Sequence, residues 1–151
     1  CAELDDGTHL SQVTAITEYI DGTFEGPSLF GDTPKDRAVT HMMNRRAENG
    51  LVDAVGAYFH FATDGLGPEL ETYQNSDWGL RQREVAIQTM TYLDGVLSTS
   101  DFLAGDQFSM ADITAFAGLA FADFAKVDIP ENLHNLIKWR AQMAQRPSIA
   151  A

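Results

Sequence analysis

The segment FSMADI at residues 108–113 contains the sharpest local signal in the sequence. The Ser109 hydroxyl can accept the backbone N–H three residues on, while the Asp112 carboxylate can accept the Ser109 N–H in return. This reciprocal capping box satisfies two donors that the first turn of a helix leaves unpaired, so the segment predicts a helix start. Phe108 and Ile113 are placed to close over the cap as a hydrophobic staple. We interpret Ser109 and Asp112 as a folding device rather than as a catalytic dyad.

The helix that follows this box is predicted to be the central helix of the fold. Apolar residues occupy nearly every side of it, which is typical of the most buried helix in a bundle. Its apolar positions are Ile113, Phe116, Ala117, Ala120, Phe121 and Phe124. Apolar residues at three-to-four residue spacing predict three more helices. These are residues 34–62, with Pro34 and Asp36 in the first turn, residues 78–97, and a last helix from Pro130 to Arg146-Pro147.

The first part of the chain has a different pattern. The segment AELDDG at residues 2–7 predicts a short strand that ends in an Asp-Gly turn. A helix follows, with Ser11 placed to cap it and one apolar face. Residues 21–34 hold Gly and Pro without periodicity, and are predicted to be a linker. The apolar face consists of Leu10, Val13, Ile16 and Ile20.

Composition limits the classes of function. A formal net charge of −12 repels phosphate backbones and anionic lipid surfaces, so nucleic acid and membrane partners are not expected. No apolar run approaches the length of a membrane span. One cysteine cannot form an internal disulfide, and no Cys and His cluster has metal-ligand spacing. We therefore expect no metal site and a reduced, cytoplasmic compartment. Cys1 is interpreted as incidental, and His9, His41, His60 and His134 as ordinary surface or boundary residues.

Two motifs together resemble the glutathione transferase superfamily. The first is LDDGTHLSQVTAITEYI at residues 4–20, and the second is FLAGDQFSMADITAF at residues 102–116, followed by a helix that holds Trp139. The stretch at residues 36–51 is similar to the first long helix of bacterial members. The resemblance implies an all-α fold, namely the C-terminal helical bundle of the family, preceded by a strand-helix remnant of a thioredoxin-like α/β domain. The implied domains are residues 1–24 and residues 33–151.

The resemblance also implies where glutathione would bind. Family members place the catalytic Ser, Tyr or Cys upstream of anything that matches Cys1, so we expect this chain to be inactive alone. The residues that match the family's glutathione seat are Gln12, Val13 and Thr14. Unpaired N–H groups at a helix start favour an anion independently of the family. Val13 stands where the family has Ser, so an ordinary helix turn remains an alternative.

A second set of residues is expected to form the pocket for the electrophile: Met42, Arg45, Arg46 and Tyr58. Arg45 and Arg46 could face an interdomain cleft and attract an anionic thiol. The alternative is a solvated face on which Arg45 pairs with Glu48. Four aromatic residues could line a pocket for hydrophobic substrates, although aromatic residues at helical spacing are more often plain core. They are Tyr58, Phe59, Phe61 and Trp78.

The sequence therefore predicts that the intact protein is a glutathione transferase. It would conjugate or reduce small hydrophobic electrophiles with glutathione as co-substrate, and form a homodimer through the long helix. The alternative is a non-catalytic binding or assembly module, as in the transferase-like domains of elongation factor gamma subunits, and Val13 favours it. A third possibility is a ligand-carrying helical domain.

Overall fold

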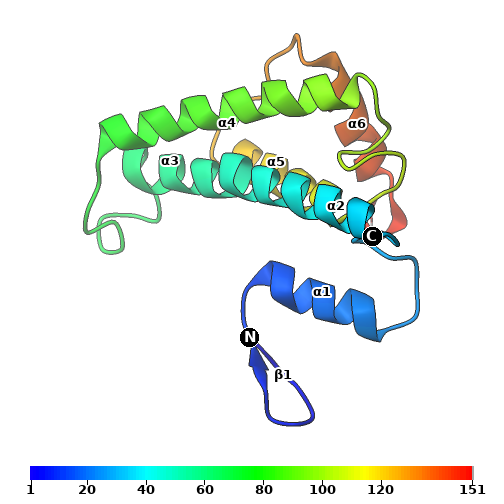
Figure 1. Ribbon diagram of the computed structural model, residues 1–151. Coiled ribbons are helices and arrows are strands. Elements are labelled where there is room, and N and C mark those ends of the chain that lie inside the picture. The colour runs from blue at the N-terminus through cyan, green and yellow to red at the C-terminus, as the bar shows by residue number, and fades with distance from the viewer. Residues whose placement is uncertain (151) are drawn as a thin grey trace.

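The computed structural model describes residues 1–150 and is mostly helical. A small hairpin and one helix form an N-terminal segment, which a linker joins to a bundle of helices (Figure 1). In chain order the elements are β1 (Ala2–Glu3), β2 (His9–Leu10), α1 (Val13–Thr23), α2 (Pro34–Ala47), η1 (Glu48–Asp53), α3 (Ala54–Ala62), α4 (Ser76–Leu97), α5 (Met110–Phe124), α6 (His134–Ala144) and α7 (Pro147–Ala150).

The start of the chain is a hairpin rather than the single strand that the sequence predicted. β1 and β2 pair antiparallel, with Ala2 opposite Leu10. The Asp-Gly turn reverses the chain because Gly7 adopts a φ of 82°, and the Gly7 N–H donates to the Leu4 carbonyl at 2.9 Å. β2 is two residues long, which is too short for alternation to reveal it.

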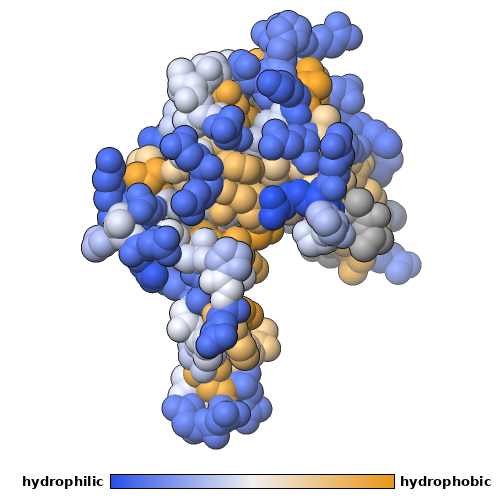
Figure 2. Space-filling view, turned by 90° about the vertical axis from the view of Figure 1, so that its right-hand side faces the viewer, coloured by the Kyte–Doolittle hydropathy of each residue, from blue (hydrophilic) through white to orange (hydrophobic). Residues whose placement is uncertain are grey.

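Helix α1 begins one residue later than expected, and the prediction that Ser11 caps it is wrong. Gln12 occupies the N-cap position in place of Ser11, and no side chain accepts a hydrogen bond there. The expected apolar face is largely open, since Val13 is 65% and Ile20 48% exposed. Figure 2 shows the N-terminal segment as a narrow stem that projects from the body of the bundle.

The long helix over residues 34–62 forms as predicted, but a π-helical segment interrupts it. Thr33 and Asp36 make a capping box at its start, with Pro34 in the first turn. The π-helical η1 then joins α2 to α3 without a break in the helical path. Gly50 of this segment lies so close to α4 that a Cβ there would sit 2.3 Å from the Thr89 hydroxyl oxygen.

Helix α5 is the most buried helix, as expected, although the residues that bury it differ from those predicted. Ala117 and Ala120 are exposed, and Phe124 is 63% exposed. Small side chains let the neighbouring helices approach closely, and a Cβ on Gly118 would lie 2.8 Å from Leu51. The buried residues of α5 are Met110, Ala111, Asp112, Ala115, Gly118, Leu119 and Ala122.

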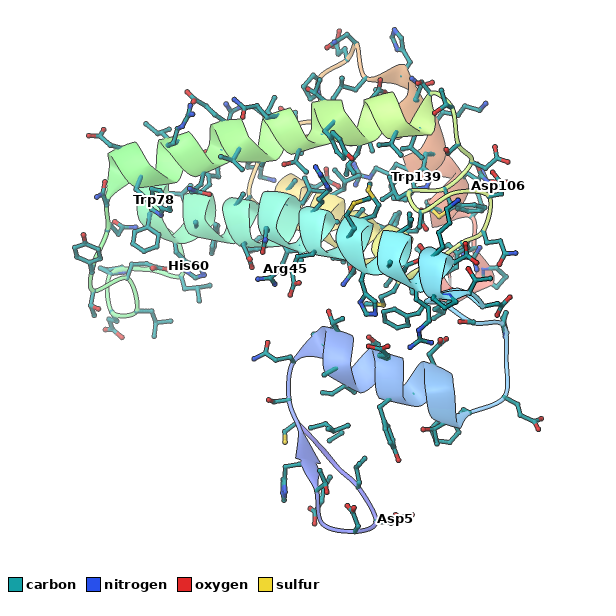
Figure 3. All side chains as sticks on the ribbon, in the orientation of Figure 1. Asp5, Arg45, His60, Trp78, Asp106 and Trp139 are labelled. Atoms are coloured by element: carbon teal, nitrogen blue, oxygen red, sulfur yellow. The ribbon has the colours of Figure 1, made fainter. Side chains whose placement is uncertain are left out.

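The helices α2, α4, α5 and α6 share one hydrophobic core. Trp139 of α6 is 3% exposed and lies inside the bundle (Figure 3). α6 ends at Ala144, and Pro147 opens a further short helix because proline suits a first helical turn. The predicted last helix therefore begins at His134 rather than at Pro130, and ends at Ala144 rather than at Arg146. The largest fully buried hydrophobic residues are Phe30, Leu51, Met90, Leu93, Leu119, Leu136, Met143, Val55 and Val127.

Candidate functional site

A cavity between α1 and α2 brings together residues that the sequence predicted separately. This α1–α2 pocket has a volume of about 510 Å³. Gln12 and Thr14 reach it from the start of α1, and Arg45 projects from the side of α2 that faces α1 (Figure 3). Val13 does not line it. The lining residues are Gln12, Thr14, His41, Asn44, Arg45 and Glu48.

Gln12 is held in a strained backbone conformation at the edge of this pocket. Its φ of 71° and ψ of 130° lie in a region that residues with a Cβ rarely adopt. Such strain costs about 1–3 kcal/mol and gathers at functional positions. The first helical bond of α1 runs from the Ile16 N–H to the Gln12 carbonyl, at 3.1 Å. The N–H groups of the preceding turn therefore have no partner within the helix and remain available to a ligand.

Asn44 ties the first turn of α1 to the bundle. Its side chain is almost fully buried at 3% exposure. The Asn44 Nδ2 donates to the Thr14 Oγ1 at 3.1 Å, and the Thr114 Oγ1 donates to the Asn44 Oδ1 at 2.6 Å. One amide thus links α1, α2 and α5. A buried amide satisfied on both sides fixes its neighbours, so Thr14 is held at a defined position in the pocket.

Charged residues of both signs lie in the same pocket. The predicted pair of Arg45 and Glu48 is confirmed, with the Arg45 Nη1 donating to the Glu48 Oε2 at 2.9 Å. On the other side, Glu18 of α1 contacts both Arg37 and His41 of α2, the latter at 3.4 Å. The contacts of Glu18 hold α1 against α2. Arg45 and Glu48 place one positive and one negative charge beside the start of α1.

A second hollow, the α2–α4 groove, lies along α2 and α4 and has a volume of about 620 Å³. Met42 and Arg46 line it, and Arg45 lines both hollows. The Arg46 guanidinium lies 4.8 Å from the centre of the Tyr92 ring. Tyr58 lines neither hollow and packs against the core. The four residues predicted for the electrophile therefore do not share one pocket.

Comparisons with known proteins agree with this architecture. The family model "Glutathione S-transferase, C-terminal domain" matches residues 81–147. A crystal structure of a glutathione S-transferase domain-containing protein from Marinobacter aquaeolei is 65% identical, with a TM-score of 0.94, and the match covers 98% of this chain and 72% of that one. The chain belongs to the glutathione S-transferase family.

Other members of the glutathione S-transferase family are also similar to this chain in sequence, and one of them in solved structure. The crystal structure of Gtt2 from Saccharomyces cerevisiae is 54% identical with a TM-score of 0.94, covering 99% of this chain and 72% of that chain. Glutathione S-transferase 2 of the same yeast is 55% identical over 97% of this chain, and a probable glutathione S-transferase from Nicotiana tabacum is 29% identical over 91%. This chain spans 63% and 58% of those two curated relatives.

Tyr58 and Phe59 pack against the core of the bundle, which supports the plainer of the two interpretations left open by the sequence. Phe59 packs in the bundle, with its ring centre 5.3 Å from that of Phe124 and 6.2 Å from that of Phe121. Tyr58 likewise packs against the core. Trp78 is instead 50% exposed at the start of α4.

One polar cluster that the sequence did not predict lies at the end of α3 and in the loop that follows it. The His60 Nδ1 lies 2.8 Å from the Glu71 Oε1, and the same oxygen accepts the Leu66 N–H at 2.8 Å. The Leu66 N–H and, after it, His60 lower the pKa of Glu71 below its ordinary value. Gln74 donates from its Nε2 to the backbone carbonyls of His60 and Thr63. His60 finds its partner eleven residues away in a loop, where helical spacing does not reveal it.

Ser109 and Asp112 form the predicted capping box of the transferase-family bundle. The Asp112 Oδ2 accepts the Ser109 N–H at 3.0 Å and the Ser109 hydroxyl at 2.9 Å, while the Oδ1 accepts the Leu103 N–H at 3.0 Å. Burial raises the pKa of Asp112, and these hydrogen bonds oppose that rise. Phe108 packs against Phe102 and Arg146, and Ile113 is exposed, so the predicted staple gains no support.

The part of the chain that the structure describes holds neither a candidate metal cluster nor a membrane-spanning helix. Within residues 1–150, no three His, Cys, Asp or Glu side chains gather closely enough to hold a metal ion. In that same part of the chain, every helix is too short or too polar to cross a bilayer.

Proposed function

We propose that the intact protein is a glutathione transferase that conjugates or reduces small hydrophobic electrophiles with glutathione. In this proposal residues 1–24 close the glutathione-binding domain and residues 33–151 form the helical domain. The chain would supply the seat for the γ-glutamyl end of glutathione and part of the wall around the electrophile. A cytoplasmic location, where glutathione stays reduced, is part of the proposal.

The observation that supports this proposal best is the content of the α1–α2 pocket. The γ-glutamyl end of glutathione carries one carboxylate and one ammonium group. The free N–H groups at the start of α1 and the Arg45 guanidinium match the carboxylate, while the Glu48 carboxylate matches the ammonium. Gln12 adds an amide at the rim, and Asn44 holds Thr14 in place.

Two structures of distant family members contain glutathione derivatives. One distant family structure, from Pseudomonas fluorescens, contains S-(propanoic acid)-glutathione, and another, from Methylobacterium radiotolerans, is a complex with glutathione sulfonate. These matches are 21% identical to this chain, so they bear on its fold and make glutathione the natural ligand to test.

The binding part of the proposal is tested by calorimetric titration of the chain with glutathione. Arg45→Ala should weaken binding about tenfold, because it removes a charge-assisted contact. Arg81→Ala is a matched control, since Arg81 is also an exposed helical arginine paired with a Glu three residues on, and it does not line the pocket. Equal losses in the two variants would contradict the proposed seat.

The catalytic part is tested by turnover. The residue that activates the thiol is expected upstream of Cys1, so the purified chain should convert a chlorodinitrobenzene-type substrate no faster than the uncatalysed reaction. Because the four residues predicted for the electrophile do not line one cavity, the proposal for that substrate rests on Arg45, beside the seat. Robust turnover by the chain alone would show that its own residues activate the thiol.

The proposal includes a homodimer formed through the long helix, with a second copy on the α2–α4 groove. Met42 is 47% and Tyr92 41% exposed along this groove, which leaves apolar surface open beside Arg46. Each copy carries a net charge of −12, so added salt should strengthen the dimer by screening repulsion. Light scattering should show Met42→Asp as a monomer, while Leu70→Asp, at an exposed loop position, should leave the dimer intact.

One observation favours the alternative, a non-catalytic binding or assembly module. Val13 is apolar and 65% exposed where the family has a serine, so the seat lacks one polar side chain. A relative of Caulobacter vibrioides, 28% identical over 91% of this chain, bears the name FtsZ-localized protein A. Retention of the full-length protein on immobilised glutathione distinguishes the two functions, because only the enzyme requires that affinity.

A further inference from the structure

A third cavity lies where the linker, the start of α2 and the loop before α5 meet. This linker pocket has a volume of about 200 Å³. It takes Gly31 and Asp32 from the linker, Asp36 and Thr40 from α2, and Asp106 from the loop, which Figure 3 places at the end of the bundle near the start of α2. It shares no lining residue with the α1–α2 pocket.

The walls of the linker pocket are fixed by hydrogen bonds. The Ser28 hydroxyl accepts the Gly31 N–H at 3.0 Å and donates to the Asp21 carboxylate at 2.9 Å. The Leu29 carbonyl accepts the Met110 N–H at 2.9 Å, which fastens the linker to the start of α5. The cavity is therefore part of the folded framework, with room for more than a single water molecule.

The side chains around the linker pocket carry charge of one sign. Asp32, Asp36 and Asp106 contribute carboxylates, and no Lys, Arg or His lines the pocket among residues 1–150. Arg146 stacks on the Phe108 ring at 3.5 Å and is not a lining residue. A cation is thus the species that this cavity would attract.

Thr40 supplies an independent sign of a missing partner. It is 3% exposed, yet its hydroxyl makes no hydrogen bond with any residue that the structure describes. Within residues 1–150, the side-chain atoms that are both fully enclosed and without a hydrogen bond are the Trp139 Nε1 and the Arg146 Nε. The Thr40 hydroxyl oxygen is not one of them, so it is not fully enclosed. Its hydroxyl oxygen therefore keeps access to the cavity that Thr40 lines. A hydroxyl removed from bulk water in this way gains from an added hydrogen-bonding partner.

We propose that the linker pocket binds a small aliphatic ammonium ion. The ammonium would donate to the Thr40 hydroxyl and to the aspartate carboxylates, and its methylene chain would lie against apolar side chains of the lining. A bare metal ion fits less well, because no three carboxylate or imidazole groups converge to ligating distance in the described part of the chain. The apolar lining residues are Leu29, Ala104 and Phe108.

The test is an NMR titration of the protein with 1,4-diaminobutane. We expect saturable binding, with the largest amide shifts at Gly31, Thr40 and Gln107. Asp106→Asn should weaken binding about tenfold by removing a charged acceptor, and Thr40→Val about threefold. Asp5→Asn is the matched control, since it changes the net charge equally at the tip of the N-terminal hairpin, away from the bundle (Figure 3).

Several outcomes would overturn the proposal. Asp5→Asn weakening the amine as much as Asp106→Asn would show only general attraction to an acidic protein. Equal binding of 1-butanol would show that the charge is irrelevant, and tighter binding of Ca²⁺ at the same amides would assign the cavity to a metal. Thermal unfolding of each variant identifies loss of the fold, and Asp106→Asn keeps the test valid if Thr40→Val unfolds. Glutathione binding is measured separately, so failure here leaves the proposed transferase function untouched.

Discussion

The first turn of a helix leaves N–H groups without partners, and the starts of α5 and α1 differ in whether side chains satisfy these groups. At α5 the Asp112 carboxylate accepts three hydrogen bonds and is completely buried. At α1 no side chain caps the helix, and the N-cap residue Gln12 is strained at a φ of 71°. Both sequences supply a serine near the helix start. Side chains cap the start of α5, whereas the start of α1 has no side-chain cap and lies beside a cavity.

This difference separates a folding device from a candidate binding site. Side chains that satisfy the first N–H groups of a helix leave nothing for a ligand, whereas an uncapped start beside a cation can accept an anion. Ser109 and Asp112 therefore stabilise the start of α5, and Gln12 and Thr14 are the residues to test for glutathione binding. Four experiments can break or sharpen this contrast.

The largest effect is expected from Asp112→Ala. It removes the cap and leaves the Leu103 and Ser109 N–H groups buried without partners, so stability should fall by about 3 kcal/mol. Asp36→Ala in the exposed capping box of α2 is the control and should lose about 1 kcal/mol. Urea denaturation measures both, and equal losses would show that burial does not set the energy of a cap.

Asn44→Ala should destabilise the protein by about 2 kcal/mol, because two partly buried hydrogen bonds are lost. It should also weaken glutathione binding, since Thr14 is no longer held. Asn49→Ala, at an exposed position of η1, should change stability by less than about 0.5 kcal/mol. Unchanged glutathione affinity in Asn44→Ala would mean that this amide serves only packing.

Gln12→Gly should stabilise the protein by about 1 kcal/mol, because glycine adopts the strained conformation freely. Lys126→Gly is the control, as Lys126 also has a positive φ, at 62°, near the end of α5. Both variants should unfold at higher urea, while only Gln12→Gly should lose affinity for glutathione. A stability gain without any change in affinity would remove Gln12 from the proposed seat.

The smallest effect concerns acid stability. Glu71 accepts a backbone N–H as Asp112 does, but its pKa is lowered whereas burial raises that of Asp112. A lowered pKa gives stability that is present above the ordinary value of 4.5 and is lost as the pH falls through the folded-state pKa. The melting temperature of the wild type should exceed that of Glu71→Gln at about pH 6, and the difference should shrink by about pH 3.

For Asp112 the sign is reversed, because the folded state holds its proton to higher pH than the unfolded chain does. Its ionisation therefore reduces stability as the pH rises from 3.8 through its folded-state pKa. An advantage of the wild type over Glu71→Gln that grows in acid would contradict the assignment for Glu71.

Much of the bundle could be predicted from sequence because its signals are local. The capping box at Ser109, the first turn at Pro34 and the periodic helices depend on residues within a few positions of one another. The α1 cap was missed because the strained Gln12 follows a hairpin that two-residue strands do not reveal. Burial in α5 was assigned to large residues, whereas close packing favoured small ones such as Ala115 and Gly118.

The candidate site was only partly predictable, because its contacts join distant residues. Gln12, Thr14 and Arg45 came from the family resemblance, and Arg45 with Glu48 from helical spacing. Asn44 meets Thr114 seventy positions along the chain, and no local pattern carries that information. The linker pocket likewise joins residues from three segments.

The π-helical turn at Glu48–Asp53 corresponds to a spacing of apolar residues that is visible in the sequence. Met43, Ala47, Leu51 and Val55 follow one another in steps of four, which a helix of 3.6 residues per turn would rotate off one face. The wider turn keeps all four buried.

This turn gives the long helix one residue more than regular α-helical geometry needs. Because a π-turn takes up an extra residue without changing the faces of the helices on either side, deleting one residue from Glu48–Asp53 would let the segment relax to an ordinary helix and leave Ala54–Ala62 facing the core. The same deletion inside Ala54–Ala62, ahead of Phe59, would instead rotate the later residues by about 100° and take Phe59 off the rings it packs on. Chimeras and shortened versions of this protein can therefore lose a residue within this turn, but not within the regular helices beside it.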